Sequence, residues 1–101
     1  MALNYGSDKK SALQAMYDAQ KIAFAPIMFQ AAKSLRDLDI LATLKAHKKG
    51  ITIEEIAEKL NLSVYGVKVL LEAGLSLEMV RVEDDKFFLT KTGWYILSDE
   101  L

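Results

Sequence analysis

The spacing of the apolar residues changes near residue 79, and this change sets the fold class. Between residues 51 and 75 apolar side chains recur every three or four positions, which is the repeat of an amphipathic helix. Over residues 79–83 they alternate with polar ones, as in a half-buried strand, and residues 86–89 can form the partner strand after a turn. The chain therefore predicts helices first and one small hairpin near its end.

Two helices precede the hairpin, and capping residues mark where they begin. Thr52 can cap the first helix, and Glu55 three residues later completes a capping box. Ser63 can cap the second helix, and Gly74 is expected to end it, since glycine is common just past a helix C-terminus. The short turn between these helices predicts a helix-turn-helix.

A last short helix is expected over residues 90–97, and it would close the bottom of the core with Trp94, Tyr95, Ile96 and Leu97. The order of helix, turn, helix, two strands and closing helix is that of a winged helix. We therefore expect a mainly α fold: a winged helix-turn-helix with a small two-stranded β-wing and an extra N-terminal arm helix.

A long helical pattern fills the first half of the chain, and Pro26 interrupts it. Because proline is poor inside a helix but suits its first turn, we expect one helix over about 8–24 and another over about 26–47, or a single kinked helix. Residues 1–25 are accordingly assigned to an arm helix and residues 26–101 to the winged-helix domain.

The arm is expected to mediate dimerisation, because a domain this small cannot easily bury two long apolar helices as well as a winged core. The other interpretation is a helix packed on the core of its own domain. The side chains predicted to form the dimer interface are apolar and recur at helical spacing: Leu13, Met16, Tyr17, Phe24 and Ile27.

The charge distribution argues against DNA binding. The net charge is −1, but residues 1–50 carry eight basic and four acidic side chains, whereas residues 51–101 carry five basic and ten acidic ones. Over residues 63–89, three cations face five carboxylates, although DNA readers depend on neutralising several phosphates. A nucleic-acid partner is therefore not expected, and a winged-helix transcription regulator stays as the alternative function.

The residue types needed for chemistry are scarce. There is no cysteine, which excludes disulfides and cysteine-based zinc sites and fits a reducing, cytoplasmic location. The one histidine, His47, sits at a helix end without paired carboxylates, and no phosphate-binding glycine pattern occurs. No apolar run approaches the roughly 20 residues of a membrane helix. We expect no catalytic, cofactor-binding or metal-binding residue in this chain, and no membrane partner.

Four segments, taken in order, resemble the N-terminal domain of small-molecule O-methyltransferases of the plant and bacterial natural-product type. They are PIMFQAAKSLRDLDILATLK at 26–45, ITIEEIAEKLNLS at 51–63, VLLEAGL at 69–75 and FLTKTGWYIL at 88–97. The resemblance covers about residues 24–98. Its most telling element is the Leu-Thr-x-x-Gly sequence at 89–93, although some transcription regulators share this sequence.

The resemblance implies that the domain dimerises through its N-terminal helices and does not bind DNA. It also implies that the partner's arm helps to wall the acceptor-substrate pocket, while S-adenosylmethionine binding and catalysis belong to a following Rossmann-like domain. The chain would then be a truncated portion of a methyltransferase, inactive alone, with a twin subunit and a small-molecule acceptor as partners. The side chains that this analogy places in the pocket wall are Met16, Phe24, Met28 and Phe29.

Overall fold

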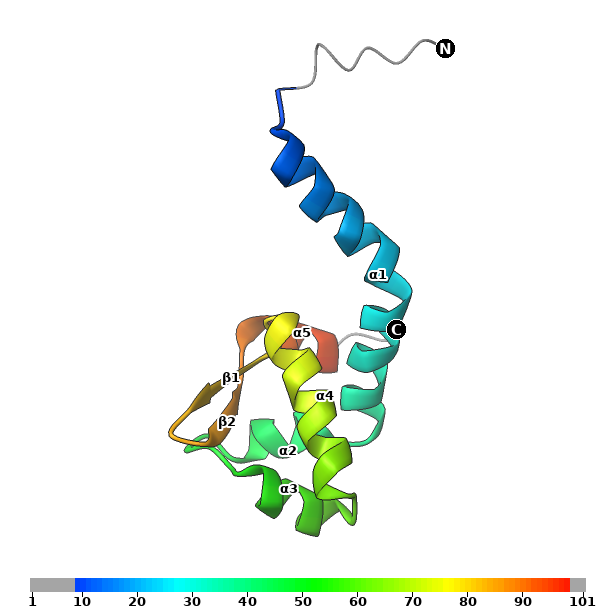
Figure 1. Ribbon diagram of the computed structural model, residues 1–101. Coiled ribbons are helices and arrows are strands. Elements are labelled where there is room, and N and C mark those ends of the chain that lie inside the picture. Colours follow the sequence, from blue (N-terminus) through cyan, green and yellow to red (C-terminus); the bar gives the residue numbers. More distant parts are fainter. Residues whose placement is uncertain (1–8, 99–101) are drawn as a thin grey trace.

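The computed structural model describes residues 9–98 (Figure 1). This part of the chain folds as the expected winged helix, mainly helical with one antiparallel hairpin. The elements in chain order are α1 Ala12–Asp37, α2 Ile40–Ala46, α3 Ile53–Leu60, α4 Val64–Ser76, β1 Val80–Glu83, β2 Lys86–Leu89 and α5 Lys91–Ser98.

The first helix is continuous through Pro26, so the prediction of two separate helices meeting there is wrong and the single-helix alternative holds. Proline removes one backbone hydrogen bond and bends a helix without having to end it, and α1 changes direction near its middle (Figure 1). The helical pattern breaks instead after Asp37, where Asp39 adopts a left-handed φ of 67°. Aspartate is one of the few residues other than glycine that visit this region.

The start of α3 is the capping box that the sequence predicts. The Glu55 N–H donates to the Thr52 hydroxyl at 3.2 Å, and the Thr52 N–H donates back to Glu55 Oε1 at 3.2 Å. Two hydrogen bonds from Thr52 lower the pKa of the Glu55 carboxyl. The bond from the hydroxyl has the larger effect and the bond from the backbone N–H the smaller one. Ser63 caps α4 in turn by accepting from the Gly66 N–H at 2.9 Å.

The end of α4 lies beyond Gly74, which corrects the expectation that this glycine stops the helix. Gly74 is buried, and a Cβ there would lie 3.3 Å from Leu35 Cδ1 and 3.2 Å from Val80 Cγ2. The glycine therefore permits close packing of α4 against α1 and β1, and the helix runs on to Ser76 with Leu77 as its C-cap.

The hairpin matches its prediction. Strands β1 and β2 pair antiparallel with Glu83 opposite Lys86 at the turn. Asp84 and Asp85 both have positive φ, at 51° and 64°, as the two central residues of a type I′ turn require. Ile51 extends the sheet through an isolated bridge to Phe87.

The core lies where α4 packs between α1, α3 and β1 (Figure 1). Every element except α5 contributes at least one buried hydrophobic residue to this core. The largest fully buried side chains are Leu35, Ile40, Leu41, Leu44, Ile56, Val67 and Leu71.

Helix α5 closes the core only in part: Ile96 and Leu97 pack against it as expected, but the two aromatic residues do not. Trp94 is 43% exposed and Tyr95 is 62% exposed, and their rings meet edge to face at 5.1 Å. The opposite side of α5 packs closely on the backbone at Met79. Gly93 is buried there, and a Cβ on this residue would lie 2.2 Å from the Met79 carbonyl oxygen. Thr90 fixes its start by accepting a hydrogen bond from the Gly93 N–H at 3.1 Å.

Candidate functional site: the exposed segment of α1 and its groove

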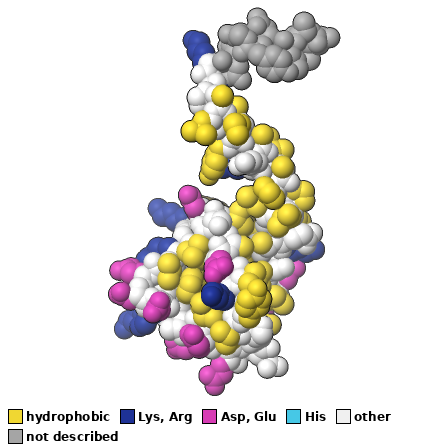
Figure 2. Space-filling model, in the orientation of Figure 1, with side chains coloured by type: hydrophobic (Ala, Val, Ile, Leu, Met, Phe, Trp, Pro, Cys, Tyr) yellow, Lys and Arg dark blue, Asp and Glu magenta, His cyan; other side chains and the backbone are white. Residues whose placement is uncertain are grey.

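The N-terminal part of α1 projects away from the rest of the molecule (Figure 1). Within the described residues, none before Ala32 is buried. We call residues 12–31 the exposed segment and residues 32–37 the packed segment of α1. Figure 2 shows hydrophobic side chains along the whole exposed segment. Met28 is partly buried, and the other large apolar side chains are 49–78% exposed: Leu13, Met16, Tyr17, Ile22, Phe24, Ile27 and Phe29.

These side chains occupy two faces of the helix. At about 100° per residue, Phe24 and Ile27 point in nearly the same direction as Leu13, whereas Ile22 and Phe29 point about 180° away. All five residues predicted for the dimer interface belong to the first face. Ile22 was missed, although its spacing of seven from Phe29 could have indicated a second apolar face.

Local interactions hold the exposed segment in its helical form. Ser11 caps the helix by accepting from the Gln14 N–H at 3.0 Å. Asp18 accepts hydrogen bonds from Lys10 and from Gln14, and both lower the pKa of its carboxyl, the bond from Lys10 having the larger effect. All of these partners lie within eight residues of one another, so local interactions support the first turns of the segment.

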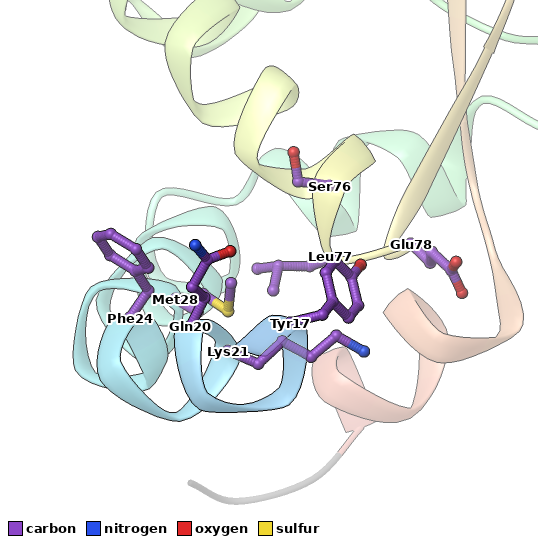
Figure 3. A pocket seen from close by; sticks show the side chains of 8 residues that line it. All are labelled: Tyr17, Gln20, Lys21, Phe24, Met28, Ser76, Leu77 and Glu78. Atoms are coloured by element: carbon purple, nitrogen blue, oxygen red, sulfur yellow. The ribbon is translucent and has the colours of Figure 1, made fainter. Parts of the chain in front are cut away.

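A groove of about 530 Å³ lies between the exposed segment and the end of α4 (Figure 3). Met28 and Leu77 form apolar walls from the two sides, and Lys21 and Glu78 bring opposite charges to the rim. The Lys21 ammonium also lies 4.6 Å from the centre of the Tyr17 ring. The groove is therefore an apolar channel with a polar edge. Its lining residues are Tyr17, Gln20, Lys21, Phe24, Met28, Ser76, Leu77 and Glu78.

A second, shallower groove of about 270 Å³ continues towards α5. It shares Met28 and Leu77 with the first groove and adds Phe29 and Ile96. Three of the four side chains expected in a pocket wall, Phe24, Met28 and Phe29, thus line one groove or both. Met16 lies on the exposed segment and lines neither of these two grooves.

The face that a DNA-reading winged helix would present is poor in cations. On α4, Tyr65 is 77% exposed and Lys68 is the single basic residue. The hairpin turn exposes Glu83, Asp84 and Asp85, and Figure 2 shows acidic side chains at this end of the molecule. Exposed apolar and acidic groups suit contact with protein better than contact with phosphate.

Across residues 9–98 no three His, Asp or Glu side chains are grouped so that they could hold a metal ion. In the same range, every buried side-chain nitrogen and oxygen has a hydrogen-bond partner. None of the helices described is both long and apolar enough to span a bilayer.

A family model described as the Dimerisation2-like domain matches residues 16–87. The chain belongs to this family. The matched range of the Dimerisation2-like domain begins in the exposed segment, includes both walls of the groove and ends in β2. The exposed segment and the winged body are therefore parts of one family unit, and this unit is a dimerisation domain.

A solved structure similar to this Dimerisation2-like domain is "CalO1, Methyltransferase in Calicheamicin Biosynthesis, SAH bound form". The likeness has a TM-score of 0.59 at 20% sequence identity and covers 91% of this chain but 27% of that chain. It shows that the two share a fold over this region. No curated protein sequence matches the chain.

Proposed function

We propose that this domain forms a homodimer within an S-adenosylmethionine-dependent O-methyltransferase and helps to wall the pocket of a small-molecule acceptor. Membership of a dimerisation family and the shared fold with part of a methyltransferase support the proposal. SAH in that neighbour is the product left when S-adenosylmethionine gives up its methyl group. Cofactor binding and catalysis would lie in a separate domain of the parent protein, which we place in the cytoplasm.

The observation that carries the proposal is the apolar surface of the exposed segment. A helix that is apolar on two opposite faces is normally covered on both of them. The winged body lies beside only part of the first face, at the groove, and leaves Phe24 52% and Ile22 75% exposed, so a second surface is needed to cover them. A second copy of the chain supplies one, and in a two-fold dimer each copy gives and receives the same contact.

The same arrangement suits a substrate wall. The groove beside the exposed segment has the volume of a small-molecule site and mostly apolar walls. We assign Phe24, Met28 and Phe29 to this wall, joined by Met16. These side chains would exclude water and position an apolar acceptor, while taking no part in methyl transfer. Functionally, residues 1–25 form the dimerising arm and residues 26–101 the winged-helix domain.

The proposal is tested by Met16→Asp combined with Phe24→Asp, followed by sedimentation equilibrium. Burying unpaired carboxylates costs several kcal/mol, so we expect the dimer dissociation constant to rise by on the order of 100-fold or more. Both positions are more than half exposed in the single chain, so circular dichroism should report an unchanged fold.

Tyr65→Asp is the matched control. It puts the same charge on another apolar side chain, 77% exposed, on α4 outside the proposed interface. The control should dimerise as the unmodified chain does. A double variant that sediments like the unmodified dimer, or an unmodified chain that is monomeric at high concentration, would overturn the proposal.

A further inference from the structure

We propose that a separate pocket, which is neither of the two grooves beside the exposed segment, binds small organic anions that carry an apolar group. The pocket has a volume of about 380 Å³ and lies where the end of α2, the hairpin and α5 meet. No residue of α1, α3 or α4 lines it. It is therefore separate both from the proposed dimer surface and from the helix that a DNA reader would use.

The charged residues that line this pocket are all basic. Lys45 and Lys48 come from the end of α2 and the connection after it, and Arg81 comes from β1. Neither lysine makes an ion pair with any residue between 9 and 98. The two lysines come from the basic half of the sequence and Arg81 from the acidic half, and no Asp or Glu lines the pocket. The pocket thus offers a local positive potential.

Two of the polar side chains are held in position before any ligand arrives. The Arg81 guanidinium lies 4.2 Å from the centre of the Phe88 ring, and its Nη1 donates to Glu83 at 3.0 Å. The His47 Nδ1–H donates to the Thr43 carbonyl at 2.8 Å, which fixes the ring. Arginine has five N–H donors in a planar fork that matches a carboxylate, so one bond to Glu83 leaves donors for a ligand.

The remaining walls are apolar and select the rest of the ligand. Trp94 and Phe88 present ring surface, and Leu44 and Leu89 complete the lining. An anion with an apolar group can use both the cations and this surface, whereas inorganic phosphate can use only the cations. A nucleic-acid strand fits less well, because Glu83 and the two turn aspartates would repel its continuing backbone.

The test is a titration followed by ¹⁵N–¹H NMR, with benzoate as the probe, at low and constant ionic strength. Trp94 is the only tryptophan in the chain, so its indole N–H is an unambiguous reporter in the pocket. We expect benzoate to shift this signal and the Lys48 amide saturably. Benzamide, the neutral molecule of the same shape, should leave both in place, and phosphate should bind more weakly than benzoate.

The variant is Lys48→Glu, which should weaken benzoate binding about tenfold through loss of one charge-assisted contact. Its control is Lys49→Glu, because Lys49 is the next residue and does not line the pocket. Equal binding of benzoate and benzamide, equal binding of phosphate and benzoate, or equal weakening by the two variants would overturn the proposal. The Met16→Asp and Phe24→Asp double variant should bind benzoate normally, so this test is independent of dimerisation.

Discussion

The two segments of α1 belong to one helix but are held in opposite ways. The packed segment contributes Ala32 and Leu35 to the core, where α1 meets α2 and α4. The exposed segment buries none of its side chains within the described chain and is held by a cap, an ion pair and its own backbone. Tertiary packing therefore fixes the winged body, whereas within a single chain only local interactions support the exposed segment.

This difference has a consequence for stability. Helices of about 12–15 residues are marginal in water unless an apolar face is packed. The exposed segment has the apolar faces but lacks the packing in a single chain. Its order should therefore depend on a second copy, whereas the order of the body should not.

The largest expected contrast is between Leu35→Ala and Leu13→Ala. Leu35 is completely buried, so its truncation should lower the free energy of unfolding by about 2–5 kcal/mol through lost burial and a cavity. Leu13 is 78% exposed, so its truncation should cost less than about 0.5 kcal/mol in the dilute chain. Urea denaturation at low protein concentration measures both. Similar losses at the two positions would mean that the exposed segment is packed on its own body.

A smaller contrast is expected between two helix caps. Thr52→Ala removes the capping box of α3 within the body and should lower the free energy of unfolding by about 1 kcal/mol. Ser11→Ala removes the cap of α1 and should reduce helix content near residue 12 without moving the urea midpoint. Circular dichroism follows the helix content and urea denaturation the midpoint. A shifted midpoint for Ser11→Ala would show that the exposed segment unfolds together with the body.

Features set by local chemistry could be predicted from the sequence. The Thr52–Glu55 capping box and the hairpin turn at Asp84 and Asp85 depend on residues three or four positions apart. Features set by distant contacts could not. Gly74 looks like a helix stop until Leu35 and Val80 are seen to pack against it.

The site follows the same division. The first apolar face of the exposed segment was predicted because helical spacing alone defines it. The groove was not, because its second wall is formed by Leu77 and neighbouring residues at the end of α4, about fifty positions away in the chain. The cationic pocket was missed for the same reason, since Arg81 and Trp94 meet the end of α2 only after folding.

The most direct test of a partner-dependent exposed segment is amide hydrogen exchange of residues 12–25, measured over a range of protein concentrations. At high concentration these amides should be protected to a degree approaching that of α4. On dilution their protection should fall while that of α4 stays constant. Protection of residues 12–25 that does not change with concentration would contradict the idea that a second copy of the chain orders this helix.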